Sequence, residues 1–529
     1  MCNGAFNRRI LGRYADKEAF GVDCVKEIRK RTGPNFPIMY RIDLSLALNE
    51  TYGGEMLATP SLKKFTRGRT VEETLAFMRN LVLAGVDAFD VDLGCYDNWW
   101  LPHPPSSMPP GCFLEVCTLV KEYFEKNNIR SNKGLPVPVA AVGKLGYPDL
   151  AESVLQDGKA DMVMLGRPLL ADPEWPNKAY AGKVDKIRPC IGCQEGCINE
   201  FVEGGHPQCA VNPRTAFEHV FPAIPAQAEE KKKVIVAGAG PAGITAAIIA
   251  ARRGHSVTLY EKSARAGGRL LPGGTPKIKY EIDNYLAYLE TMLKQAEKET
   301  KLSFKPETEV NLKILKKLKA DVIIFAMGTR DAKLPLPGIE DTVQAADLFM
   351  NPELLGEAKK VVIAGGGVVG CEAAYWLRYE KDCDVTVIEM DKYIMNHTCT
   401  ANRGHLIHYL QKGGVKLLNC TRLTRVTREG AEVMRNVSKT VPDPYITWHP
   451  ILPENVVNPL APKLRIEEKS ETIPADLVVM AAGGAPDNAL YLEALAENIA
   501  PELYNIGDSF NAGKVLEANR AAYRLAIRL

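Results

Sequence analysis

Apolar positions in the first part of the chain follow two alternating periods. Segments with apolar residues at helical spacing are each followed by a short apolar run, and this cycle occurs four times. Short apolar runs bounded by turn residues are typical of buried strands, and strands that alternate with helices indicate parallel βα units. The predicted helix and strand pairs are 20–31 with 36–43, 71–84 with 86–93, 113–126 with 137–142, and 149–155 with 161–165.

The second half of the chain contains two short apolar runs, 234–237 and 361–364, that predict buried strands. Each is followed by a glycine-rich turn, an apolar helix and a further short strand, a pattern that predicts two related nucleotide-binding units. Residues 430–470 contain proline and charge without clear periodicity. We therefore expect loops or a hairpin there.

Composition serves mainly to exclude classes of partner and compartment. A chain of 529 residues suggests roughly three or four domains. The net charge of +2 gives no reason to expect nucleic acid or an acidic membrane surface as partner. We find no signal segment and no apolar run long enough to span a bilayer. Thirteen mostly scattered cysteines do not form a secreted disulfide framework, so we expect a reducing cytoplasm.

The first glycine-rich turn has the spacing of a dinucleotide-binding loop. Gly238, Gly240 and Gly243 follow a strand directly and open a helix, and Glu261 ends the next strand. Glycines let the backbone approach a pyrophosphate, the helix N-terminus presents free N–H groups, and a carboxylate about twenty positions on accepts hydrogen bonds from a ribose. With all of these features together, we predict that this unit binds a nucleotide.

The second turn repeats the pattern with Gly365, Gly367 and Gly370, and its strand ends in Glu389. A carboxylate at this point favours a ribose 2′-hydroxyl and repels a 2′-phosphate, so we expect NADH rather than NADPH. Lys392 lies nearby and weighs against this preference. The alternative is that these glycines serve only close packing.

Four cysteines lie between the two halves in the pattern C-x2-C-x3-C-x11-C. They are Cys190, Cys193, Cys197 and Cys209. Four thiolates can hold a [4Fe–4S] cluster or a tetrahedral zinc ion, and ligand type alone leaves both open. The neighbouring nucleotide units favour the cluster, because it carries single electrons and zinc carries none.

The second half resembles the flavoprotein reductases that have two dinucleotide domains. In these proteins the first fingerprint holds FAD and is followed by a glycine pair, here Gly267-Gly268-Arg269. Residues 326–329 resemble the family's hinge strand, and Asp508 resembles the aspartate that meets the flavin ribityl and phosphate region. The resemblance implies that the second fingerprint holds NAD(H).

The cysteine spacing is similar to that of the trimethylamine dehydrogenase and 2,4-dienoyl-CoA reductase family, where it holds [4Fe–4S]. That family joins an Old Yellow Enzyme-like (β/α)8 barrel with FMN to the cluster and the FAD and NAD domains, and the resemblance covers essentially the whole chain. It implies an α/β fold with the C-terminal half of the barrel, an iron–sulfur linker and two Rossmann-like domains. The implied boundaries are 1–185 for the partial barrel, 186–230 for the cluster segment, 231–335 with 480–529 for FAD, and 336–479 for NAD(H).

Half of the barrel is absent from this sequence. A barrel has eight strands, whereas four precede the cysteines, and these correspond to the last four. Residues 6–9 resemble the segment just after the fourth strand. A mis-called start codon, a fragment and a truncated relative would all give this pattern.

The family resemblance also implies an FMN site in the partial barrel. Loops after the last two barrel strands often bind phosphate, and here they carry Gly143-Lys144 and Gly166-Arg167. Arg41 would meet the flavin pyrimidine edge. The alternative is that Arg41 and Arg167 are surface residues that only pair with carboxylates. Tyr96 falls where relatives place a proton-donating histidine, and it is the catalytic candidate, although a packed aromatic loop explains it equally.

These features predict an NADH-dependent reductase of an activated carbon–carbon double bond, such as an enoate, enoyl-CoA, enone steroid or bile-pigment-like polyene. Electrons would pass from NADH to FAD, [4Fe–4S], FMN and substrate. The alternatives are an amine dehydrogenase or demethylase, and a truncated NADH diaphorase without an organic substrate. The expected partner is a small-molecule substrate, with no nucleic acid or membrane. Homo-oligomers are compatible with the sequence, which does not set the oligomeric state.

Overall fold

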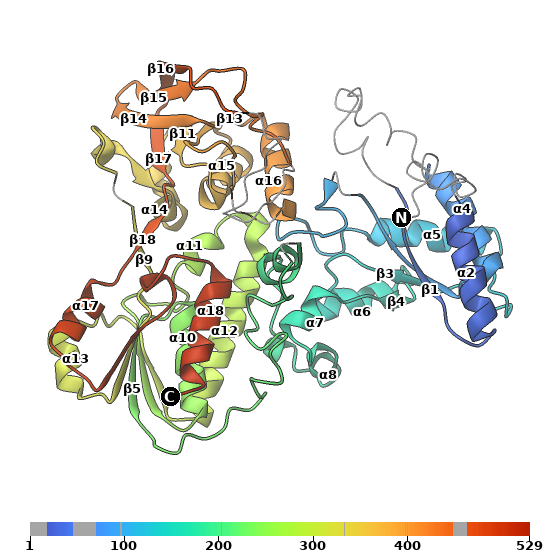
Figure 1. The fold of residues 1–529 in the computed structure, drawn as a ribbon, viewed down its shortest axis with the longest axis horizontal. Helices are drawn as coiled ribbons and strands as arrows, with labels where there is room; N and C mark the ends of the chain where they lie inside the picture. Colours follow the sequence, from blue (N-terminus) through green and yellow to red (C-terminus); the bar gives the residue numbers. More distant parts are fainter. Residues whose placement is uncertain are drawn as a thin grey trace. The chain divides into compact units, whose positions relative to one another are not determined.

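The computed structural model describes residues 18–45, 70–95, 98–202, 204–332, 334–396, 398, 400–447 and 463–529. It divides into two compact units, Met1–Gly166 and Arg167–Leu529 (Figure 1). Each unit has its own hydrophobic core. The division falls at Gly166, so the segment between 167 and 185, which we expected in the barrel, lies in the second unit.

The first unit is built on a four-stranded parallel sheet of order β1-β2-β3-β4, which confirms the four predicted βα units. Its strands are β1 (Met39–Asp43), β2 (Ala88–Asp92), β3 (Val139–Ala141) and β4 (Met162–Val163). Its helices are α2 (Ala19–Thr32), α4 (Val71–Ala84), α5 (Leu114–Lys126) and α6 (Pro148–Gln156). Helix α4 has the predicted bounds.

Local chemistry explains where α4 begins and ends. The Thr70 hydroxyl accepts a hydrogen bond from the Glu73 N–H at 3.1 Å, and the Glu73 carboxylate accepts one from the Thr70 N–H at 3.0 Å. This capping box satisfies two backbone donors that the first turn leaves without helical partners. Gly85 ends the helix with a φ of +124°, a conformation that favours glycine.

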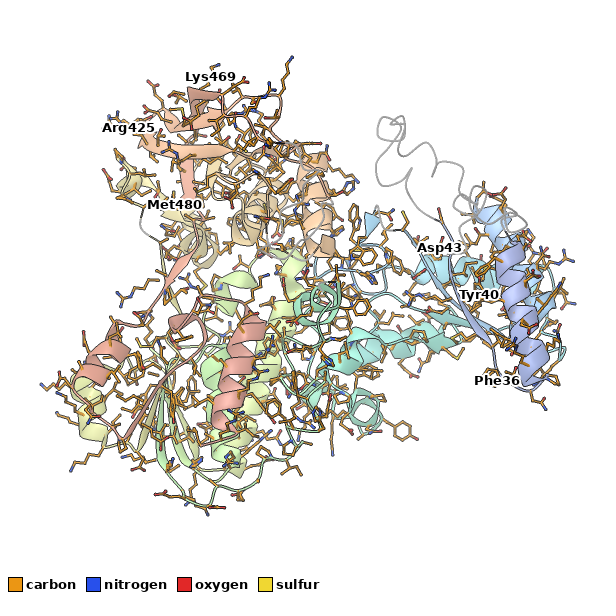
Figure 2. All side chains as sticks on the ribbon, viewed as in Figure 1. Phe36, Tyr40, Asp43, Arg425, Lys469 and Met480 are labelled. Atoms are coloured by element: carbon orange, nitrogen blue, oxygen red, sulfur yellow. The ribbon has the colours of Figure 1, made fainter. Side chains whose placement is uncertain are left out.

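Aromatic side chains fill the core of the first unit. Tyr40 on β1 packs against Phe77 of α4 and Phe89 of β2, with ring centroids 6.4 and 6.3 Å apart (Figure 2). Phe77 and Phe89 are fully buried. The helix is therefore fixed to the sheet by large apolar groups at favourable aromatic distances.

The second unit begins with a five-stranded parallel sheet of order β19-β8-β5-β6-β7. Its strands are β5 (Lys233–Ala237), β6 (Ser256–Tyr260), β7 (Leu302–Lys305), β8 (Val322–Phe325) and β19 (Glu502–Asn505). Its helices are α10 (Pro241–Arg252), α11 (Leu270–Gly273), α12 (Tyr280–Glu299), α13 (Leu312–Leu318), α17 (Ala489–Ala496) and α18 (Val515–Ala526). Strand β19 comes from the last part of the chain, so two distant segments build this sheet.

A second five-stranded parallel sheet, of order β10-β17-β11-β12-β13, lies between them in sequence. Its strands are β10 (Val343–Gln344), β11 (Lys360–Ala364), β12 (Asp384–Ile388), β13 (Lys416–Leu418) and β17 (Leu477–Met480). Its helices are α14 (Ala345–Met350), α15 (Val368–Glu380) and α16 (Thr400–Lys412). The two parallel sheets confirm the two predicted strand–helix–strand units.

Two small antiparallel sheets complete the second unit. Strands β14 (Thr421–Thr427), β15 (Gly430–Asn436) and β16 (Glu468–Pro474) form one. A tight hairpin joins β14 to β15, and β15 pairs with β16, so the region 430–470, where we expected loops or a hairpin, contains one strand of the hairpin and the start of a third strand. Strands β9 (Thr329–Asp331) and β18 (Gly484–Pro486) form the other. Strands β9 and β18 link the two parallel sheets. Strand β9 begins at Thr329, the last residue of the predicted hinge strand 326–329.

The segment that carries the four cysteines has little regular structure. Its short elements are α7 (Arg167–Ala171), α8 (Trp175–Tyr180), η3 (Val184–Lys186), the π-helical turn η4 (Glu195–Asn199) and α9 (Glu200–Val202). The remaining short turns are η5 (Lys277–Lys279), η6 (Ile339–Asp341), η7 (Pro352–Leu355) and η8 (Gly507–Ser509). A search of the described residues finds no helix with the length and apolar character needed to cross a membrane.

Candidate redox site

The first glycine-rich loop joins β5 to α10 and has the geometry of a dinucleotide-binding turn. Gly238 has a φ of +100°, and a Cβ on Gly243 would overlap the Gly238 carbonyl oxygen. The buried Glu261 carboxylate accepts hydrogen bonds from the N–H groups of Ala239 at 2.8 Å and Ser263 at 2.9 Å. The predicted carboxylate therefore fixes the loop, and its contact with a ribose stays a prediction.

The second loop, between β11 and α15, repeats this arrangement. Gly365 has a φ of +115°, and a Cβ on Gly370 would overlap the Gly365 carbonyl oxygen. Glu389 accepts hydrogen bonds from the N–H groups of Gly366 at 2.7 Å and Asp391 at 2.8 Å. Two segments with different sequences thus build one local structure, because both place glycines and a carboxylate at the same spacing.

Both loops lead into helices that begin directly after a glycine, and the first turn of α15 lines a cavity. Gly240 and Gly367 immediately precede α10 and α15. The N–H groups of a first helical turn have no helical partner and attract phosphate. Gly268 lies against Gly240, and a Cβ on Gly268 would approach its Cα to 3.0 Å. The predicted glycine pair therefore packs directly on the first loop.

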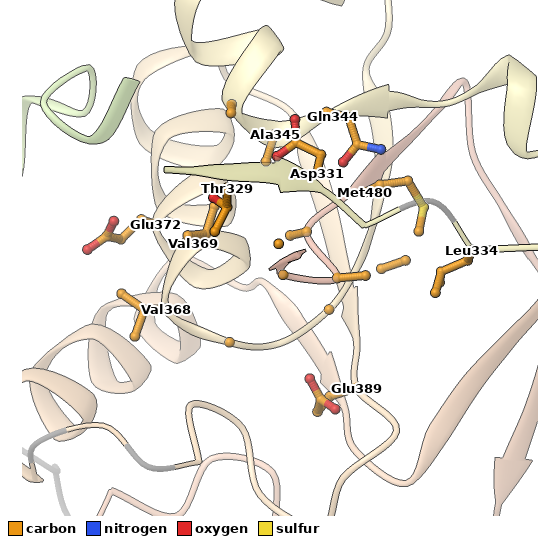
Figure 3. Close-up of a pocket in the computed structure, with 18 of the residues that line it drawn as sticks. Thr329, Asp331, Leu334, Gln344, Ala345, Val368, Val369, Glu372, Glu389 and Met480 are labelled. Atoms are coloured by element: carbon orange, nitrogen blue, oxygen red, sulfur yellow. The ribbon is translucent and has the colours of Figure 1, made fainter. Parts of the chain in front are cut away.

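One cavity of about 680 Å³ is lined by predicted residues of both nucleotide units (Figure 3). From the FAD-binding segments come Arg269 and Asp508, and from the second unit come Gly365, Gly367 and Glu389. The walls also include Thr329, Asp331, Leu334, Gln344, Val368, Val369, Glu372, Arg422, Met480 and Gly513. Hydride transfer requires the two reacting rings in contact, and a cavity shared by both units allows this.

An ion pair lies at the end of the cavity that is lined by the segments predicted to bind FAD. Arg269 forms an ion pair with Asp331 at 2.8 Å and donates to the Thr329 carbonyl at 3.1 Å. Asp508 accepts a hydrogen bond from the Gly513 N–H at 3.2 Å. Burial raises the pKa of the Asp508 carboxyl above its usual value, although the Gly513 N–H and Arg269 oppose this effect.

The four cysteines of the linker come together, and none of them forms a disulfide. Cys190 interacts electrostatically with Cys209, and Cys193 interacts with the other three. The Gln208 N–H donates to the Gly196 carbonyl, so the chain before Cys209 runs back beside the loop that holds the first three cysteines. Burial raises the pKa of all four thiols, that of Cys190 to about 12 and that of Cys209 to about 11.

Backbone amides point at all four sulfurs. The donors are the N–H groups of Gly192 to Cys190, Glu195 to Cys193, Ile198 to Cys197, and Val211 and Asn212 to Cys209. Four clustered thiols with amide donors are a donor set that fits an iron–sulfur cluster. Within the parts of the chain that the structure describes, no three His, Cys, Asp or Glu side chains are placed to share one metal ion.

Two arginines lie near the cysteines, and one of them is Arg167 of the predicted FMN site. The Arg167 guanidinium opposes the rise in the pKa of Cys190 and Cys197, and Arg188 does the same for Cys209. Arg188 donates to the Tyr288 hydroxyl at 3.1 Å. We expected Arg167 at the FMN phosphate; the structure places it in the second unit beside the cysteines, and its phosphate contact stays a prediction.

The predicted FMN residues of the first unit lie at the carboxyl end of the parallel sheet. Gly143 and Gly166 follow β3 and β4, the end at which such sheets bind ligands. The Lys144 amine donates to two backbone carbonyls, at 2.9 and 3.0 Å. Tyr96, the catalytic candidate, lies outside the described residues, as do residues 6–9.

Arg41 pairs with carboxylates of the neighbouring strand. Its guanidinium lies 2.5 Å from Asp92 and 3.6 Å from Asp90. Burial raises the pKa of both aspartates, and Arg41 opposes this effect. This is the alternative that we stated for Arg41, and the expected contact with a flavin stays a prediction.

Sequence patterns missed several polar residues beside the cysteines. Lys279 forms a 2.6 Å ion pair with Glu372 on α15. Asn519 on α18 donates to the Ala210 carbonyl at 2.8 Å and the Tyr285 hydroxyl at 2.9 Å. The one available signal was Glu372, a carboxylate two residues after the last glycine of the fingerprint on a helix that is otherwise largely apolar.

Known proteins share these features along nearly the whole chain. Residues 232–502 match the pyridine nucleotide-disulphide oxidoreductase model, and residues 115–186 match the NADH:flavin oxidoreductase / NADH oxidase family. Cinnamate reductase of Clostridium sporogenes is 32% identical over 97% of this chain and 70% of its own length. NADH oxidase of Thermoanaerobacter brockii is 30% identical over 98% of this chain and 71% of its own.

A solved structure supports the same relationship. The 2-naphthoyl-CoA reductase in its complex with 2-naphthoyl-CoA superposes with a TM-score of 0.78 at 26% identity, over 97% of this chain and 68% of that one. The predicted fold class is thereby confirmed, with half of the flavin barrel joined to two nucleotide-binding domains. The chain belongs to the Old Yellow Enzyme-like NADH:flavin oxidoreductases of the enoate reductase, 2,4-dienoyl-CoA reductase and trimethylamine dehydrogenase family.

Proposed function

We propose that this protein is an NADH-dependent iron–sulfur flavoenzyme that reduces an activated carbon–carbon double bond. The observation that carries the proposal is the shared cavity, which joins the Glu389 loop to Arg269 and Asp508. Such a cavity serves an enzyme that exchanges hydride between two dinucleotides. The names of cinnamate reductase and 2-naphthoyl-CoA reductase support a conjugated acid or thioester as substrate.

The chain's own groups account for binding of both nucleotides. When bound, FAD would take hydride from NADH, and [4Fe–4S] and FMN would carry the electrons to the substrate double bond. The N-termini of α10 and α15 would bind the pyrophosphates of FAD and NAD(H). Glu261 and Glu389 would face the adenosine riboses, and the charge of Glu389 would exclude a 2′-phosphate, which favours NADH over NADPH.

The neighbouring nucleotide units favour iron over zinc at the four cysteines. Four thiolates can hold a tetrahedral zinc ion or a [4Fe–4S] cluster. A cluster carries single electrons between flavins, whereas zinc carries none. Cys190, Cys193, Cys197 and Cys209 are free thiols that interact electrostatically with one another, which is compatible with a cluster at this point of the chain.

The substrate side would lie at the carboxyl end of the first unit's sheet. There Gly143, Lys144 and Gly166, with Arg167, would hold the FMN phosphate, Arg41 would face the flavin, and Tyr96 would donate a proton to the substrate. A phenol can donate the proton that completes addition of hydrogen across a double bond. These roles are part of the proposal.

Anaerobic purification followed by cofactor and turnover measurements tests the proposal. We expect FAD, FMN and about four irons per chain, with NADH oxidation that depends on cinnamate or an enoyl-CoA and yields the saturated acid. NADH oxidation with ferricyanide but with no enoate indicates a diaphorase. Reduction of the protein by dimethylamine indicates an amine dehydrogenase, and either of these results contradicts the proposal.

A further inference from the structure

A buried ion pair connects the wall of the nucleotide cavity to the region of the cysteines. Lys279, the last residue of η5, contacts Glu372 of α15 at 2.6 Å, and their side chains are only 17% and 12% exposed. Glu372 lines the cavity, as Figure 3 shows. Burial by itself would lower the pKa of Lys279, but Glu372, Cys193 and Glu281 together raise it above its usual value, so the side chain stays an ammonium.

The same ammonium lies within the electrostatic reach of the cysteine loop. The side-chain amide of Asn402 on α16 donates to the Cys193 carbonyl at 2.6 Å, which joins this loop to the second nucleotide unit. Lys279 interacts electrostatically with the Cys193 thiol and with Glu281, and Glu281 in turn interacts with Cys190. Lys279 therefore pairs with a carboxylate of the cavity wall and interacts electrostatically with a thiol of the cysteine loop.

The stability of the fold gives little reason for burying the Lys279–Glu372 ion pair. Removing two charges from water opposes their attraction, and apolar residues of similar volume are often as stabilising as a buried ion pair. An electrostatic role is different, because an interaction between charges strengthens as the surrounding dielectric constant falls. The reduction potential of an iron–sulfur cluster depends on net charge, hydrogen bonds to sulfur and exposure to solvent.

We propose that Lys279 is a positioning residue that sets the reduction potential of the cysteine-bound cluster, and that Glu372 limits its effect. One-electron reduction adds one negative charge to a four-thiolate site that is already negative. A nearby ammonium stabilises this added charge and raises the potential, so electrons pass more readily from the nucleotide cavity toward the cysteines. The inference rests on the proposed function, since it requires iron rather than zinc at the four thiols.

The test is an anaerobic redox titration of the full chain, followed by electron paramagnetic resonance. Lys279→Met removes the positive charge and should lower the cluster potential. Glu372→Gln leaves Lys279 without its counter-charge and should raise the potential. We expect at least a tenfold change in the ratio of reduced to oxidised cluster at fixed potential in each variant, which is 59 mV for a one-electron couple.

Two further variants separate charge from structure. The double variant Lys279→Met with Glu372→Gln should return toward the wild-type potential. Lys294→Met removes a lysine from an exposed ion pair with Glu290 on α12 and should leave the potential unchanged. If Lys279→Met fails to retain iron, Glu372→Gln decides by the sign of its shift.

The outcomes distinguish this inference from the proposed function. Suppose that the wild-type chain contains iron, but the cluster potentials of the two single variants are unshifted or shift with the same sign. This result overturns the role of Lys279 and leaves the proposed function intact. Zinc in place of iron in the wild-type chain overturns both the cluster and the role of Lys279. Opposite shifts in the two single variants, with an unshifted Lys294→Met, support the inference.

Discussion

Glu389 should control both the affinity for NADH and the discrimination against NADPH. Its carboxylate accepts two backbone hydrogen bonds, from Gly366 and Asp391, which hold the second glycine loop in shape. Glu389→Ala removes both acceptors together with the negative charge that we propose faces the ribose of NAD(H). Hydrogen bonds to charged groups contribute about 1.5–3 kcal/mol each when the partner is left buried.

The expected magnitude follows from the exposure of the two donors. The N–H of Asp391 lies at an exposed residue and can bond to water instead, whereas Gly366 is buried. We therefore expect a net loss of about 2 kcal/mol in NADH binding, roughly a 30-fold increase in Kd. The affinity for NADPH should fall less, because the same substitution removes repulsion of the 2′-phosphate.

Stopped-flow reduction of the bound FAD by each nucleotide measures both constants. Glu261→Ala is the matched control, since Glu261 holds the first loop through Ala239 and Ser263. It should lower FAD content and leave the preference between NADH and NADPH unchanged. An unchanged Kd for NADH in Glu389→Ala, or loss of FAD from that variant, would refute the assignment of the second loop to NAD(H).

Four further outcomes follow from the structure. Gly243→Ala should abolish FAD binding and Gly370→Ala should abolish NADH binding with FAD retained, because each new Cβ overlaps a backbone carbonyl oxygen; flavin content and NADH titration distinguish the two. Cys209→Ser should reduce bound iron, measured after anaerobic purification, while FAD is retained. Phe77→Ala empties a fully buried site and should destabilise the first unit by about 3–5 kcal/mol, measured by urea unfolding. Burial raises the pKa of Asp508 in the folded chain, so the unfolded state loses this proton first and the free energy of unfolding should fall as pH rises from the usual carboxyl pKa to the raised one. Asp508→Asn should remove this part of the pH dependence.

Local patterns in the sequence predicted the parts of this protein that are built by near neighbours in the chain. Helix 71–84 has its predicted bounds, and the short strands predicted just before Glu261 and Glu389 are present as β6 and β12. The sequence also located both glycine loops and the carboxylate that accepts a backbone hydrogen bond from each loop. The physical reason is that a helix or strand repeats its side-chain direction with a fixed period, and a tight turn demands glycine at set positions.

Only the tertiary structure decided which distant groups meet. The sequence contains Lys279 and Glu372 ninety-three positions apart, and no period connects them. The register of β1 against β2 places Arg41 beside Asp92 and Asp90, and no local pattern shows this pairing. Arg167 follows a predicted barrel strand, but it belongs to the second unit, near Cys190. The partner of a long charged side chain depends on how whole elements pack, and this information is spread over the entire fold and is absent from any local pattern.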